Sequence, residues 1–148
     1  MHIVFVSREY VPTFRGGGIA SYIKETAIGL VKKGHRVTVI CASDDTNEES
    51  EYMDDGVSVI RLSGGDFVVS EKEYKSCLRK FRCLYRFYSY RKKILKRLKE
   101  IDNIDIVEVA EFGAEAFYLS KLHVPVVIRL HTPCLLYTSP SPRDPKTS

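Results

Sequence analysis

Three consecutive glycines, Gly16, Gly17 and Gly18, lie between a short apolar segment and a segment with helical periodicity. Glycine leaves room for a ligand beside the backbone, and the N-terminus of a helix offers unpaired N–H groups and the positive end of the helix dipole. This combination suits a phosphate or a sugar hydroxyl. A loop that needs glycine only for flexibility would contain the same residues, and the local sequence favours neither interpretation.

Two polar side chains, Glu111 and His131, each follow a segment that we expect to be a strand. Ligands of open α/β sheets bind beyond the carboxyl ends of the strands, so both side chains are candidates for one site. Each also has a structural explanation. An acid such as Glu111 can cap or complement the first turn of a helix, and a lone histidine at the end of a strand usually has a structural role.

Short apolar segments alternate with segments of helical periodicity along the chain. Apolar runs rich in β-branched residues predict five strands, at residues 2–6, 36–41, 57–62, 105–109 and 124–130, and the first of them is expected to be buried on both faces. Helical spacing predicts helices at residues 19–33, 71–101 (one or two helices) and 111–121. Residues 44–55 contain seven acids and no Lys or Arg, which indicates a solvated loop. The alternation predicts an α/β fold with a Rossmann-like parallel sheet and flanking helices.

The composition is that of an ordinary globular protein. The chain has 148 residues, of which 44% are hydrophobic and 28% charged, and no apolar run approaches the ~18 residues of a membrane span. The apolar N-terminal segment has no basic leader, so we expect no signal peptide. The cysteines lack metal-ligand spacing, which favours reduced thiols in the cytoplasm and no metal site. A net charge of +4 is too small to indicate nucleic acid binding by itself.

The hydrophobic pattern stops after Pro133. Residues 134–148 are rich in Ser, Pro and Thr, which is typical of a disordered tail, and the run from Cys134 to Asp144 resembles the conceptual translation of a sequencing adapter. We therefore expect one incomplete domain at residues 1–133, followed by an artefactual or disordered tail at 134–148. In that interpretation the natural sequence departs from this one near Pro133, and the gene continues.

Several segments together resemble the family 4 glycosyltransferases. The first segment is Pro12 followed by Gly16 and Gly17. The others are residues 33–39 (KGHRVTV), 105–108 (DIVE), 111–116 (EFGAEA) and 129–133 (RLHTP). The resemblance implies the N-terminal, acceptor-side domain of a two-domain GT-B enzyme. It further implies a retaining reaction, in which a sugar moves from a nucleoside-diphosphate sugar to a glycan or a lipid-linked acceptor.

The same resemblance assigns roles to the candidate residues. It implies that Glu111 faces the acceptor sugar, although many relatives carry a histidine where this chain has Ala110. It places His131 near the transferred sugar of the donor, as a hydrogen-bond partner, and it makes Gly16, Gly17 and Gly18 part of the substrate site. It implies no cofactor. Because the missing domain would supply most nucleotide contacts, the fragment is expected to be inactive alone.

The segment at residues 71–100 is basic and aromatic, with twelve Lys or Arg against three acids. A helical stripe includes Cys77, Leu78, Phe81, Leu84, Tyr85, Tyr88, Leu95 and Leu98. The simplest interpretation is a helix that packs this stripe on the sheet and leaves a solvated basic face. A basic amphipathic helix can also lie on an anionic membrane, which would place the protein peripherally on the inner membrane surface. Nucleic acid is not an expected partner.

Two other classes of function remain open from the sequence. An NAD(P)-dependent oxidoreductase would use an acid after the second strand, and Asp44 stands there, but the glycine fingerprint needs a tighter turn and a Gly or Ala in place of Ser21. A non-enzymatic module that binds membrane or nucleic acid would depend on residues 71–100 alone.

Overall fold

The computed structural model describes residues 1–13, 17–44, 48–65, 79–111 and 114–131. Its sheet has six strands in the order β3-β4-β2-β1-β5-β6. The strands are β1 (His2–Val6), β2 (Arg36–Ala42), β3 (Ser50–Asp54), β4 (Val57–Leu62), β5 (Ile106–Ala110) and β6 (Val126–Arg129). Five of them are parallel to their neighbours, and β3 pairs antiparallel with β4. The predicted α/β class with a mostly parallel sheet is therefore confirmed.

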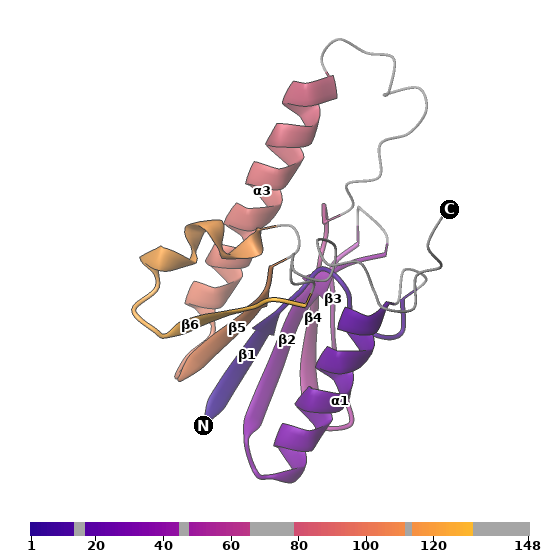
Figure 1. Cartoon of the computed structure of the whole chain (residues 1–148), viewed down its shortest axis with the longest axis vertical. Helices are drawn as coiled ribbons and strands as arrows, with labels where there is room; N and C mark the ends of the chain where they lie inside the picture. The colour runs from indigo at the N-terminus through magenta and orange to yellow at the C-terminus, as the bar shows by residue number, and fades with distance from the viewer. Residues whose placement is uncertain (14–16, 45–47, 66–78, 112–113, 132–148) are drawn as a thin grey trace, which may run out of the picture.

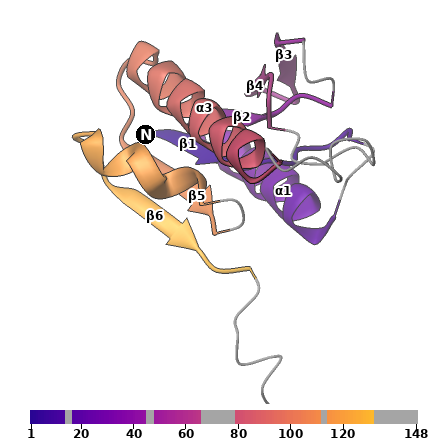
Figure 2. The ribbon, with the colours of Figure 1, turned by 90° about the horizontal axis from the view of Figure 1, so that it is seen from above.

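Helices cover both faces of the sheet (Figures 1 and 2). On one face, α1 (Gly18–Lys32) packs Ile23 and Ala27 against side chains of β1, β2 and β4. On the other face lie α3 (Arg79–Glu100) and the 3₁₀ helix η1 (Glu115–Lys121). Alternate residues of each central strand point to opposite faces, so β1 contributes Phe5 to one core and Val6 to the other.

The edge strand β3 corrects the expected solvated loop at residues 44–55. Its side chains are exposed or half-buried, so it lacks the apolar run that marks the other strands. Asp55 and Gly56 connect it to β4, and both have positive φ, of 48° and 84°. An Asp-Gly pair between two strands is typical of a tight hairpin turn. This pair was therefore the feature of the sequence that indicated a strand within the acidic segment.

The packing face of α3 matches the expected stripe only toward the C-terminal end of the helix. There Leu98 is buried and Leu95 packs against the same core, as expected, together with Tyr90 and Ile94. Phe81 and Leu84, by contrast, are 72% and 66% exposed. The first turns of α3 project beyond the carboxyl ends of the strands (Figure 1), so no sheet lies beneath them. Cys77 and Leu78, which the expected stripe included, lie outside the described residues.

The helix expected at residues 111–121 is shorter than predicted. The 3₁₀ helix η1 begins at Glu115, and Ala114 before it has a left-handed backbone conformation. Glu111 therefore does not cap this helix. Residues 134–148 lie outside the described residues, so the expectation of an artefactual tail stays a prediction.

Gly65 provides a test of the core beneath α3. A Cβ atom at this position would overlap the Cβ atom of Ala42 and lie 2.9 Å from Cζ of Tyr90. Gly65→Ala should therefore lower the free energy of unfolding by about 1–3 kcal/mol, because the sheet and the buried ring leave no space. The control is Gly29→Ala in α1, where the added Cβ meets nothing within 4 Å and should stabilise by about 0.5–1 kcal/mol. Urea unfolding measures both, and equal stability of the two variants would contradict the packing described.

Among the described residues, no helix combines the length and the apolar character that a membrane crossing requires.

Candidate functional site

The carboxyl ends of the five parallel strands share one edge of the sheet, and α1 begins at that edge. Gly17 immediately precedes α1, and Gly18 is its first residue, whereas Gly16 lies outside the described residues. Both glycines are exposed. Among the described residues, a Cβ at Gly17 would meet only Oε2 of Glu9, at 3.6 Å, and one at Gly18 would meet nothing within 4 Å. The described residues therefore leave space beside Gly17 and Gly18, at the first N–H groups of α1, which have no partner within the helix.

The structure joins the other two predicted residues directly. Glu111 follows β5, and its backbone N–H donates to the carbonyl of Arg129, so the β5–β6 pairing continues past the end of β5. This pairing places the Glu111 carboxylate beside His131, whose backbone N–H donates to Oε2 of Glu111 at 2.9 Å. The Glu111 carboxylate thus holds the main chain at His131.

Tyr22 connects this pair to α1. Its ring meets the imidazole of His131 edge to face, with 5.0 Å between the ring centroids. Tyr22 lies one helical turn after Gly18, so the contact brings α1 and the ends of β5 and β6 to one place. The sequence analysis did not select Tyr22, because its helical spacing matched an ordinary core position.

An ion pair between Glu108 and Arg129 lies beside the contact of Tyr22 with His131. Glu108 of β5 accepts two hydrogen bonds from Arg129 of β6, at 2.5 Å from Nε and 3.1 Å from Nη2. The hydroxyl of Tyr22 donates to the same carboxylate at 3.3 Å, and the Arg129 guanidinium lies over the Tyr22 ring, 5.1 Å from its centroid. A bidentate pair of this kind fixes the planes of both groups. Glu108 therefore positions Arg129 and Tyr22 beside His131.

A cavity of about 270 Å³ opens beside Glu111. Its lining is otherwise apolar: Ala110, Ala114, Ala116, Phe117 and Ile128. A mostly apolar hollow with one carboxylate at its wall is the usual composition of a small-molecule site. A larger cavity of about 330 Å³ lies away from this edge, between β3 and α3. The acids and bases that line it pair with one another, as Lys93 does with Glu49, so it is a weaker candidate.

Glu115 is the most unusual acid near this edge. Its side chain is 1% exposed, and among the described residues neither carboxylate oxygen has a hydrogen-bond partner. Burial raises the pKa of the Glu115 carboxyl to about 7, while its own backbone N–H and the charges of Arg8 and Arg91 act in the opposite direction. The acid is therefore partly protonated near neutral pH.

This raised pKa predicts how stability depends on pH. Between the pKa of an unfolded Glu, ~4.3, and the folded pKa of about 7, the folded protein binds more protons than the unfolded chain, so the free energy of unfolding should fall as pH rises. Glu115→Gln stays neutral at every pH, so it should remove this slope and be more stable than the parent at pH 8 by roughly 2–3 kcal/mol. Urea unfolding from pH 4.5 to 8 measures the effect. Glu25→Gln, at an exposed position of α1, should leave the slope unchanged. A persistent slope in Glu115→Gln would assign the dependence to another group.

Metal-binding side chains do not cluster in this part of the chain. Within the described ranges, no group of three or more His, Cys, Asp or Glu side chains is arranged to hold a metal ion. Cys41, which the structure shows as a free thiol, is buried in the sheet.

The model of glycosyltransferase family 4 matches residues 16–147. The chain belongs to this family. The match includes the glycine segment, both edge residues Glu111 and His131, and most of the tail that the sequence analysis set apart. No curated protein sequence matches this family 4 chain.

Solved structures share the fold of this family 4 glycosyltransferase chain. Sucrose-phosphate synthase from Thermosynechococcus elongatus superposes with a TM-score of 0.62 at 15% identity, over 95% of this chain and 36% of that one. The catalytic domain of starch synthase IV from Arabidopsis thaliana, bound to ADP and acarbose, gives 0.59 at 16% identity, over 88% and 34%. A trehalose-6-phosphate protein from E. coli, bound with UDP-2-fluoro glucose, gives 0.52 at 12% identity, over 90% and 33%.

These likenesses confirm the GT-B type of fold. The family 4 chain spans about a third of the length of the three structures. Because the chain belongs to a glycosyltransferase family, the alternative of an NAD(P)-dependent oxidoreductase is excluded. The spacing of the glycines had already disagreed with a dinucleotide-binding fingerprint.

Proposed function

We propose that this family 4 domain is the N-terminal, acceptor-side part of a retaining glycosyltransferase. The enzyme would move a sugar, of the hexosyl type, from a nucleoside-diphosphate sugar to a glycan or lipid-linked acceptor. The observation that carries the proposal is the meeting of Glu111, His131 and Tyr22 next to the start of α1, at the edge where open α/β sheets bind ligands. Two structures of similar fold were solved with ADP and acarbose and with UDP-2-fluoro glucose, which fits this substrate class.

Each part of the edge has a role in the proposed reaction. The backbone at Gly17 and Gly18 admits a phosphate or sugar hydroxyl to the N-terminus of α1, where the helix dipole favours negative charge. The imidazole of His131 hydrogen-bonds the transferred sugar. Glu111 holds the backbone of His131 in place and accepts hydrogen bonds from acceptor hydroxyls. A second domain would stabilise the departing nucleotide, so the present chain alone should not turn over. The proposal includes no metal or cofactor.

The complete protein tests this function. We expect it to consume one of a panel of UDP-, ADP- and GDP-sugars in the presence of glycan or polyprenyl-phosphate-sugar acceptors. The anomeric configuration of the product, read by NMR, should be that of the donor. The 148-residue chain, assayed beside it, should be inactive. Inversion at the anomeric carbon would contradict the retaining assignment, and failure to bind any nucleotide sugar would contradict the function itself.

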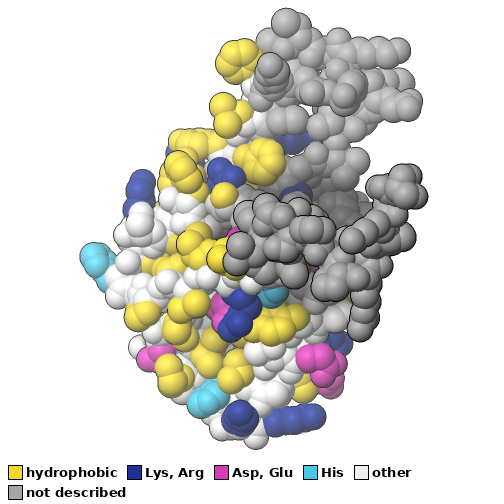
Figure 3. All heavy atoms as spheres, viewed as in Figure 1, with side chains coloured by type: hydrophobic (Ala, Val, Ile, Leu, Met, Phe, Trp, Pro, Cys, Tyr) yellow, Lys and Arg dark blue, Asp and Glu magenta, His cyan; other side chains and the backbone are white. Residues whose placement is uncertain are grey.

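A lipid-linked acceptor is favoured by one surface of the domain. Exposed apolar side chains on α3 and η1 lie among cationic ones (Figure 3), and we name them the aromatic patch: Phe81, Leu84, Tyr85, Tyr88 and Phe117. Lys92 lies over the Tyr88 ring and Lys121 over the Tyr118 ring. Aromatic side chains among cations suit the boundary between headgroups and acyl chains of an anionic bilayer. We therefore propose a cytoplasmic enzyme that touches the inner membrane surface through this patch.

Charge reversal tests the membrane proposal. The triple variant Lys92→Glu, Lys96→Glu and Lys121→Glu should weaken binding to phosphatidylserine vesicles at least about tenfold at low salt, because repulsion replaces attraction. Lys93 is left unchanged, since its ammonium bonds Glu49 and Ser63. The control reverses the exposed Lys32 and Lys33 at the far end of α1, and should bind as the parent does. Equal binding by all three proteins would remove the membrane from the proposal.

A further inference from the structure

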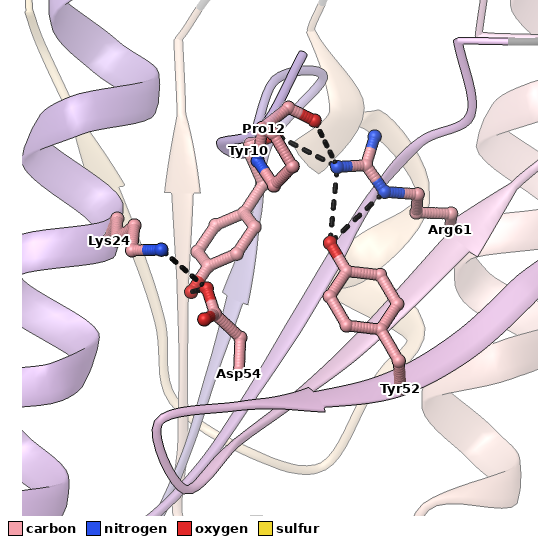
Figure 4. Close-up of polar contacts among 6 residues, drawn as sticks. All are labelled: Tyr10, Pro12, Lys24, Tyr52, Asp54 and Arg61. Atoms are coloured by element: carbon pink, nitrogen blue, oxygen red, sulfur yellow. Dashed lines mark hydrogen bonds and ion pairs between the residues drawn. The ribbon is translucent and has the colours of Figure 1, made fainter.

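Residues 7–13 follow β1 and lead the chain toward α1, and one buried side chain holds this described part of the loop. Arg61, on β4, is 8% exposed. Its Nη2 group donates to the carbonyl oxygen of Tyr10 at 3.1 Å and to that of Pro12 at 2.6 Å (Figure 4). Both acceptors belong to the loop backbone, so these contacts fix the path of the main chain.

The guanidinium of Arg61 is itself fixed from the other side. The hydroxyl of Tyr52 on β3 accepts from Nε at 3.2 Å and lies 3.1 Å from Nη2. Because Nη2 has two hydrogens for three acceptors, one of them is shared. Nη1 reaches Oδ2 of Asp44 at 3.5 Å. The planar guanidinium makes all these contacts at once, which the single ammonium of a lysine cannot reproduce.

A second set of contacts ties the same loop to α1. The ring of Tyr10 is fully buried, and its hydroxyl donates to Oδ2 of Asp54, at the end of β3, at 3.0 Å. Lys24 of α1 donates to the same oxygen at 2.9 Å (Figure 4). Further along the loop, the hydroxyl of Thr13 donates to Asp44 at 2.6 Å, four residues before Gly17. The loop and the helix that follows it are therefore both held by the β3–β4 hairpin.

We propose that Arg61 is a positioning residue for Gly17 and the start of α1: by holding the carbonyls of Tyr10 and Pro12, it sets where these groups meet the substrate. Arg61 lies under the loop and would not touch substrate. The inference rests on the proposed function of the glycine segment. Without the guanidinium the loop samples other positions, so only a fraction of the molecules can bind substrate. The apparent affinity is then the intrinsic affinity multiplied by that fraction.

The experiment compares Arg61→Lys, Tyr52→Phe and a control, Arg97→Lys, in the complete protein. Arg97 also pairs with β3, through Glu51, but its other ion pair, with Glu100, lies within α3, so its described ion pairs do not involve the loop. Amide hydrogen exchange is followed at the loop and the first turn of α1, and steady-state kinetics use the nucleotide sugar that supports turnover. Arg61→Lys should speed exchange in this region about tenfold and raise KM by a similar factor, with kcat within a few-fold. Tyr52→Phe should give a smaller change of the same kind, and Arg97→Lys none.

The outcomes separate the two proposals. Faster local exchange with an unchanged KM would show that Arg61 holds the loop but that the glycine segment does not bind substrate, which overturns the positioning role and the site assignment together. Unchanged exchange and kinetics in Arg61→Lys would overturn the positioning role and leave the function standing. If Arg61→Lys unfolds, Tyr52→Phe decides: exchange that rises uniformly over all strands would make Arg61 an ordinary core residue, and a rise confined to the loop supports the proposal.

Discussion

Replacing Gly17 by valine should lower the transferase activity of the complete protein about a hundredfold and change its free energy of unfolding by less than ~1 kcal/mol. The backbone at Gly17 is extended, with φ of −118° and ψ of −170°, so a larger residue causes no strain there. The valine methyl groups would instead occupy the open space before the first N–H groups of α1. The loss should therefore be one of substrate approach, measured as kcat/KM.

A graded control accompanies this prediction. Gly17→Ala adds only a Cβ, whose nearest described neighbour is Oε2 of Glu9 at 3.6 Å, so it should lose much less activity than Gly17→Val. Thermal unfolding of both variants should match the parent. Activity of Gly17→Val within a few-fold of the parent would show that the segment is only a connection between β1 and α1.

Replacing His131 by alanine should lower kcat by about a hundred- to a thousandfold, the usual cost of removing one hydrogen-bond partner from a reacting centre. The backbone N–H of residue 131 would still donate to Glu111, so the main chain should keep its place. The loss therefore belongs to the imidazole. His131→Asn, which retains a hydrogen-bonding side chain, should recover part of the activity.

The control for this variant is His123→Ala. His123 is exposed in the turn before β6, and its removal should leave kcat unchanged. Tyr22→Phe keeps the ring against the imidazole and should also stay near the parent. If His131→Ala retains the kcat of the parent, His131 serves only the structure of the strand end.

The sequence predicted the interior strands well, because a strand with neighbours on both sides is mostly apolar and stands out in the sequence. Strands β1 and β4 have the predicted bounds, because both lie in the interior of the sheet, where most of their side chains are apolar and buried. Strand β3 is an edge strand whose neighbour on one side is solvent, so polar side chains suffice and its composition resembles a loop. Only the turn residues Asp55 and Gly56 distinguished it.

The candidate site was predictable only in part. The parallel sheet alone placed Glu111 and His131 at one edge, because the carboxyl ends of parallel strands lie together. Their hydrogen bond and the contact with Tyr22 depend on side-chain directions that no spacing in the sequence reveals. Arg61 was hidden for a different reason: its acceptors are backbone carbonyls about 50 residues away, and backbone carbonyls leave no mark on composition.

The strand order has a consequence for the synthesis of the protein. The first strand made, β1, lies in the interior between β2 and β5, and the contact of His2 with Asp105 joins residues 103 positions apart. Pairings so distant in sequence slow folding, because a long loop must close before its contacts form. On the ribosome, β1 can pair with β2 early, but its other side stays open until β5 has emerged. Among the six described strands, the part of the edge that carries Glu111 and His131 therefore forms after the rest, because it needs β5 and β6 beside the earlier strands.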